Sequence, residues 1–162
     1  MLSTLALFST MNAHAGALDA DRFTLSLPAQ INVVGLSAGV MPGLLWQPLG
    51  PDSRGHVRAA VGIVAGPELA VAPVAVGVRG VLRPDKTLRP GIGAGVQFQA
   101  FMPYGHELVP RLDQYYEFTL DYEVREGLRV AAELSPEFGW VGGFGLGMAA
   151  RLGVQMDFPV AR

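Results

Sequence analysis

The stretch from Gly143 to Phe158, G-F-G-L-G-M-A-A-R-L-G-V-Q-M-D-F, alternates strictly between two kinds of side chain. Every even-numbered position is apolar, whereas the odd-numbered positions carry glycine, alanine or a polar residue such as Arg151 or Asp157. Because successive side chains of a β-strand point to opposite faces, this pattern predicts one fully apolar face and one small or polar face. At about 3.3 Å per residue, the stretch can cross a bilayer at a tilt. It predicts a wall strand of a closed barrel, with lipid outside and a narrow polar interior.

The same alternation recurs along the rest of the chain. Further strands are predicted at Val33–Trp46, His56–Gly66, Leu69–Arg83, Leu88–Phe101, Gln114–Arg125 and Leu128–Ser135, with a weaker one at Arg22–Pro28. Pro42 cannot donate to a strand ladder, so we expect an irregularity there. Eight strands is the smallest usual size of a bacterial outer-membrane barrel. The predicted fold class is therefore all-β, an up-and-down antiparallel transmembrane β-barrel of eight strands.

Segments rich in Gly, Pro and polar residues separate these strands. Turns are predicted at Pro48–Gly55, Gly66–Glu68, Arg83–Thr87, Glu126–Gly127 and Pro136–Gly142, and the longest connection at Met102–Asp113. Outer-membrane barrels have short periplasmic turns and longer outer loops. With both termini periplasmic, Met102–Asp113 is expected on the outer side. The aromatic residues Trp46, Phe101, Tyr104, Tyr115, Tyr116, Trp140, Phe144 and Phe158 are expected mostly near strand ends, where interfacial girdles lie.

The composition agrees with a surface that does not meet water. Only 16% of the residues are charged, against about 25% in ordinary soluble domains. Beyond the N-terminus there is no apolar run of about 18 residues, which excludes a helical membrane bundle. Cysteine is absent, which excludes disulfides and Cys-ligated metals. The net charge of −2 gives no basic footprint, so we expect no nucleic-acid partner.

Residues 1–17 are interpreted as a signal peptide, followed by a single barrel domain over residues 18–162. Leu2–Met11 is a short apolar core, and the residues Ala13 to Ala17 contain two small-x-small cleavage patterns. No Lys or Arg precedes Arg22, so a frayed apolar N-terminus is the alternative interpretation.

Charged residues avoid the apolar faces of all the predicted strands. A lipid-facing Arg or Lys at the midplane costs about 2–4 kcal/mol, which accounts for this exclusion. Nine charged residues are predicted to face the interior: Arg58, Arg79, Glu117, Asp121, Glu123, Arg129, Glu133, Arg151 and Asp157. Because charges out of water must pair, they predict a structural network of ion pairs in the lumen. An ion-conducting or gated pathway is the alternative.

A soluble, lipocalin-like ligand-binding barrel is a second alternative, with the apolar face inside. Three features oppose it. The other face is rich in Gly, it carries few of the Lys residues that guard soluble strands, and an eight-stranded interior would be overfilled by large apolar side chains from every strand.

Catalytic chemistry has weak support. His106 and Glu107 lie together in the longest connection, and Ser135 and Glu137 near the next, where an activated pair could form. No serine motif accompanies them, and His56 has no partner at ligand spacing. The segments G-I-G-A-G and G-F-G-L-G do not open a helix, so they are not nucleotide loops. We predict no catalytic, cofactor or metal site and no enzymatic activity; a lipid-modifying barrel enzyme is the alternative.

Over residues 22–158 the pattern resembles the small outer-membrane barrels of Gram-negative bacteria, of the OmpA-domain and OmpX style. The ending Q-M-D-F, with Leu152, Val154, Met156 and Phe158 alternating, is similar to that family's C-terminal assembly signal. The resemblance implies a monomer in the bacterial outer membrane, with membrane lipids and the barrel assembly machinery as partners. It implies a structural or surface-interaction role, although the family also includes small channels and lipid-A-modifying enzymes.

Overall fold

The computed structural model describes residues 22–33, 36–48, 53–83, 86–141 and 145–159. Its strands are β1 (Arg22–Asn32), β2 (Ser37–Val40), β3 (Gly43–Gln47), β4 (Gly55–Val61), β5 (Ile63–Ala65), β6 (Leu69–Val81), β7 (Leu88–Pro103), β8 (Val109–Arg125), β9 (Leu128–Val141) and β10 (Gly145–Pro159). In this part of the chain, no helix is long and apolar enough to cross a membrane. The signal peptide predicted at residues 1–17 and the aromatic residue Phe144 lie outside the described ranges.

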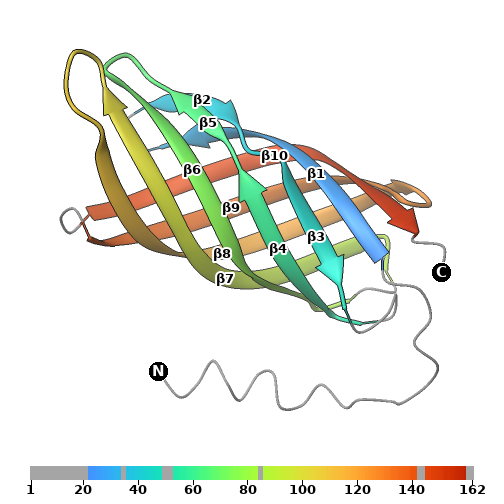
Figure 1. Ribbon diagram of the computed structural model, residues 1–162. Helices are drawn as coiled ribbons and strands as arrows, with labels where there is room; N and C mark the ends of the chain where they lie inside the picture. Colours follow the sequence, from blue (N-terminus) through green and yellow to red (C-terminus); the bar gives the residue numbers. More distant parts are fainter. Residues whose placement is uncertain (1–21, 34–35, 49–52, 84–85, 142–144, 160–162) are drawn as a thin grey trace.

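The sheet closes on itself through β1 and β10. These two strands pair antiparallel from Arg22 opposite Pro159 to Asn32 opposite Ala149. The short segments β2 and β3 together form one barrel strand beside β1, and β4 and β5 form the next, which pairs with β6. From β6 to β10 each strand pairs with the following one. Figure 1 shows the tilted strands, with the start of β1 and the end of β10, the termini of the barrel, at one end. The predicted all-β, up-and-down barrel of eight strands is confirmed.

The two interrupted strands break at neighbouring points. The irregularity predicted at Pro42 is confirmed, because β2 ends at Val40 and β3 begins at Gly43. The adjacent break at Gly62 was not predicted. There, a Cβ added to Gly62 would lie 2.6 Å from the carbonyl oxygen of Val40. The backbones at residues 40 and 62 can therefore lie this close together only because residue 62 has no side chain. Backbone hydrogen bonds from Val61 to Pro42 (3.0 Å) and from Gly62 to Pro73 (2.9 Å) hold the wall together across the breaks.

Several strands are longer than the sequence pattern indicated. The predicted end of the first strand at Pro28 is wrong, since β1 continues to Asn32. The predicted turn at Pro136–Gly142 is also wrong over most of its length, because β9 runs to Val141. A proline loses one donor but keeps its carbonyl; that of Pro28 accepts a hydrogen bond from Met41 at 3.1 Å. The remaining hydrogen bonds keep β1 paired with β10 and β2, so this strand continues through Pro28.

The long outer connection predicted at Met102–Asp113 is wrong as well. β7 extends to Pro103 and β8 begins at Val109, which leaves only residues 104–108 between them. The turns predicted at Pro48–Gly55, Gly66–Glu68, Arg83–Thr87 and Glu126–Gly127 do separate strands. The end of the barrel opposite the termini therefore has short connections at residues 66–68 and 104–108.

The outer surface is apolar and the interior is mostly polar. Phe118, Leu134 and Leu152 are 57%, 55% and 62% exposed, whereas Glu117 and Arg151 are 1% and 3% exposed. This places the predicted apolar faces outside and contradicts the soluble, lipocalin-like alternative, in which they would line a cavity. The interior also holds a small apolar cluster that was not predicted: Met41, Ala60, Ala75 and Tyr115.

Aromatic side chains gather on the wall near the chain termini. Phe23 of β1 lies opposite both Trp46 of β3 and Phe158 of β10 in the strand register, and the rings of Phe23 and Trp46 stack at 6.4 Å. Trp46 and Phe158 thus lie near strand ends on the outer face, as predicted. The placement of Tyr115 was wrong, because its side chain is inside and only 2% exposed.

Candidate functional site

Glu133 of β9 lies at the centre of an ion-pair network in the barrel interior. Its carboxylate oxygens lie 3.2 Å from Arg58, 3.7 Å from Arg79 and 3.6 Å from Arg151. Arg151 is also its direct cross-strand partner on β10. The side chain of Glu133 is 2% exposed, so one buried carboxylate interacts with three buried guanidinium groups. Such a charge is tolerable out of water only because it is paired.

Three further carboxylates surround these arginines. Glu117 of β8 pairs with Arg58, and Asp121, also of β8, pairs with Arg79 at 2.7 Å. Glu137 of β9 lies 3.5 Å from Arg151. The arginines of β4 and β6 thereby reach across the lumen to β8 and β9, which are not their neighbours in the sheet. The network ties together strands on opposite sides of the barrel.

A second cluster lies toward the end with the chain termini. Arg129 of β9 donates to Asp157 of β10 at 2.5 Å and to the hydroxyl of Thr24 of β1 at 3.2 Å. Thr24 also donates to Asp157 at 2.6 Å. These three residues join β1, β9 and β10, where the barrel closes.

The nine charged residues predicted for the interior divide between these clusters and the rim. The central network includes Arg58, Arg79, Glu117, Asp121, Glu133 and Arg151, and the closure cluster includes Arg129 and Asp157. Glu123 is nearer the rim, with a side chain that is 27% exposed, and pairs with Arg89 of β7.

Further charged residues of the interior were missed, and within the described ranges they include Arg89, Arg111, Asp113 and Glu137. Arg111 and Asp113 were assigned to a connection, and so was Glu137. Continuing the alternation of β8 back from Glu117 to residue 111, and that of β9 forward from Glu133 to residue 137, places all three on the inner face. That extension was the signal available in the sequence.

Arg111 fills the interior near the end opposite the termini. It donates to Asp113 at 2.5 Å and to the carbonyl of Gly145 at 3.2 Å, and its guanidinium lies 5.7 Å from the centre of the Phe101 ring. An added Cβ at Gly139 would lie 2.5 Å from Arg111 Nε. Glycine on the neighbouring strand thus makes room for this arginine.

The residues considered for catalysis do not form a common site. His106 and Glu107 are exposed in the connection after β7. Ser135 is fully buried and donates to the carbonyl of Tyr116 at 2.9 Å, and Glu137 belongs to the interior network. Among the residues that the structure describes, no group of three His, Cys, Asp or Glu side chains could hold a metal ion.

No family model matches this chain, and no curated protein sequence matches it. Solved structures of bacterial outer-membrane proteins have a similar fold. The chain is similar to the N-terminal β-barrel domain of Pseudomonas aeruginosa OprF, with a TM-score of 0.69 and 16% identity over 85% of this chain and 97% of that one. It is also similar to a major outer membrane protein from Thermus thermophilus, with a TM-score of 0.65 and 11% identity over 86% and 100%. A third similar structure is the outer membrane protein OprG from Pseudomonas aeruginosa, with a TM-score of 0.56 and 11% identity over 90% and 99%. The resemblance to small outer-membrane barrels therefore holds for the fold.

Proposed function

We propose that this chain is an integral protein of the bacterial outer membrane with a structural, non-enzymatic role. The observation that carries the proposal is the inverted distribution of side chains. Among the described residues, the wall exposes many large hydrophobic side chains, while polar and charged residues outnumber hydrophobic ones inside. Burial of apolar surface is the main stabilising term in folding, at roughly 25 cal/mol per Å². An apolar surface that runs over the strands of a whole barrel wall is typical of a protein in contact with membrane hydrocarbon.

The filled interior favours a structural role for the barrel over that of an open channel. Arg58, Arg79 and Arg151 reach Glu133 from three strands, and Arg111 of β8 reaches a carbonyl of β10 farther along the barrel. A chain of paired, buried charges fills the narrow space of an eight-stranded barrel. The expected result of that filling is rigidity of the wall, not transport.

The short connections favour a structural role over recognition of partners at the cell surface. At the end opposite the termini, residues 66–68 and 104–108 form compact reversals between long strands. Binding surfaces of barrels are usually built from long loops on a rigid scaffold. A monomer that contacts outer-membrane lipids, after insertion by the barrel assembly machinery, is the assembly that this arrangement supports.

Fractionation of cells that express the chain tests the proposal. We expect the protein in the outer-membrane fraction of a density gradient, resistant to carbonate extraction and released by detergent. A folded barrel should also migrate differently on gels before and after boiling. Release by carbonate without detergent would contradict the membrane assignment.

A further inference from the structure

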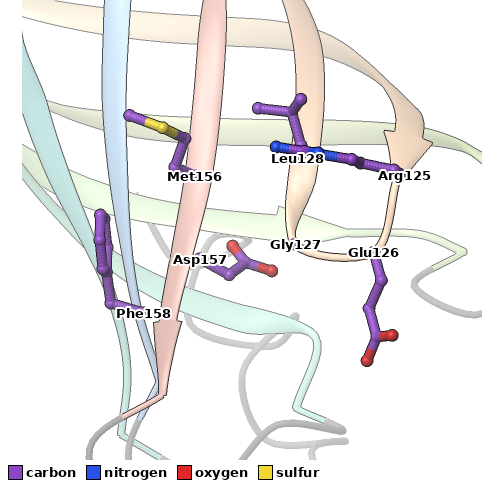
Figure 2. Close-up of a pocket in the computed structure, with 7 residues that line it drawn as sticks. All are labelled: Arg125, Glu126, Gly127, Leu128, Met156, Asp157 and Phe158. Carbon is purple, nitrogen blue, oxygen red and sulfur yellow. The ribbon is translucent and has the colours of Figure 1, made fainter.

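A pocket of about 440 Å³ lies at the turn between β8 and β9, on the end of the barrel that carries the termini. Figure 2 shows its lining: Arg125, Glu126, Gly127, Leu128, Met156, Asp157 and Phe158. Apolar side chains of two strands and one exposed arginine meet here. Of the lining residues, Asp157 is the one that also belongs to an interior cluster, where it pairs with Arg129.

A register shift brings Arg125 to the outer face of the barrel. Strict alternation from Glu117 through Glu123 would direct residue 125 inward. The pairing of β8 with β9 slips between Glu123 and Arg125, so that Arg125 lies opposite Leu128. Directly opposed residues share a face of the sheet, and Leu128 is in turn opposite Met156 of β10. Arg125, Leu128 and Met156 therefore form a row across three strands on the outer wall.

The charge of Arg125 is not neutralised within the part of the chain that the structure describes. Among the described residues, Arg125 has no hydrogen bond or ion pair. Glu126 is the nearest carboxylate in the sequence, and in Figure 2 its side chain points away from the arginine. Asp157 accepts hydrogen bonds from Thr24 and Arg129. The pocket thus presents an unpaired cation beside an apolar floor.

The pocket lies at the level of the membrane–water interface, where the headgroup of a lipid joins its acyl chains. Phe158 lines the pocket and is also part of the outer aromatic group near the termini. Aromatic girdles mark the membrane–water interface of outer-membrane barrels. A cation at this level, in one row with Leu128 and Met156, puts a positive charge beside apolar side chains, which matches the phosphate and the acyl chain of a phospholipid.

We infer that this rim pocket binds an anionic phospholipid, with the phosphate on Arg125 and an acyl chain along Leu128 and Met156. The planar guanidinium of an arginine suits the oxygen pair of a phosphate. The inference rests on the proposed function, because the lipid is available only to a barrel that lies in the membrane.

The test is lipid retention after extraction from a bilayer. The barrel is reconstituted into vesicles of phosphatidylglycerol and phosphatidylethanolamine and extracted in mild detergent. The bound lipid is then counted by native mass spectrometry. We expect the wild type to retain phosphatidylglycerol preferentially and Arg125→Gln to retain about five-fold less, the effect of one interfacial cation. Arg83→Gln, at an exposed arginine of another connection at the same end, is the matched control and should retain the wild-type amount.

Equal retention by the wild type and Arg125→Gln, or an equal loss in Arg83→Gln, would overturn the lipid site. Migration on gels without boiling checks that each variant is folded and inserted. A barrel that inserts but shows no loss in Arg125→Gln contradicts the lipid site alone. A wild type that does not enter the vesicles contradicts the proposed function together with the site.

Discussion

Gly95 of β7 lies directly beneath the hydroxyl of Tyr115 of β8, and a Cβ added to Gly95 would come within 2.6 Å of that oxygen. The two residues are register partners, and Gly77 of β6 continues the row on the next strand. The large ring of Tyr115 therefore lies inside a narrow barrel over two glycines. The absence of side chains on β6 and β7 is what allows Tyr115 to be buried there.

This relationship predicts that Gly95→Ala destabilises the barrel. The new methyl group would also lie 2.7 Å from the Cα of Gly77, so backbone as well as the tyrosine must move. Overfilling a packed interior typically costs about 1–3 kcal/mol. Urea unfolding in lipid vesicles measures the free energy of unfolding. Gly80→Ala is the control, because its Cβ would meet atoms no closer than 3.8 Å; an equal effect of both variants would contradict the packing argument.

A second prediction concerns the centre of the ion-pair network. Glu133→Gln removes the charge that Arg58, Arg79 and Arg151 share. Leaving buried charges without their partner costs roughly 3–5 kcal/mol, and we expect a loss of that size in the free energy of unfolding in vesicles. Glu126→Gln, in the exposed turn after β8, should change it by less than about 0.5 kcal/mol.

A double variant separates pairing from other effects of the glutamine. Arg151 lies opposite Glu133 on the neighbouring strand. If the cost of Glu133→Gln comes from an unpaired arginine, adding Arg151→Gln should cost less than it does in the wild type. Strictly additive losses would show that the two charges are not coupled.

The faces of the strands could be predicted from sequence, because they depend on a local rule. Side chains alternate every residue, and a charge on the lipid side is costly, so Glu117 and Arg151 could be placed inside from their neighbours alone. The strand ends were not predictable in the same way. Pro28, Pro136 and Gly139 are typical of turns, but pairing on both sides carries β1 and β9 through these positions.

The individual ion pairs could not be predicted at all. Arg58 of β4 and Glu117 of β8 meet across the lumen, although two other strands lie between them in the sheet. Which residues face each other across a barrel depends on the tilt and stagger of all its strands. Arg125 shows the same limit on a smaller scale, because a single register shift moves it to the outer face, whereas strict alternation would place it on the inner one.

A third prediction is that the wild-type barrel does not conduct ions steadily. Arg58, Arg79 and Arg151 meet Glu133 in the middle of the interior, and Arg111 of β8 bonds to β10 farther along. Ions would have to displace paired charges whose separation is costly in a medium of low dielectric constant. Planar-bilayer recording of the purified protein should show no stable open level. A well-defined, weakly selective pore would contradict the packed interior.

The last prediction tests which face of β8 meets lipid. Leu120 is 45% exposed and its neighbour Thr119 is 6% exposed, so the two side chains point to opposite faces of one strand. Leu120→Arg places a charge on the outer wall, at a cost of about 2–4 kcal/mol near the midplane of a bilayer. We expect this variant to be depleted from the outer membrane and to lack the folded band on gels without boiling. Thr119→Ser keeps a hydroxyl in the interior and should assemble like the wild type. Normal assembly of Leu120→Arg would mean that this wall does not lie against hydrocarbon, because an exposed arginine carries no such cost in water.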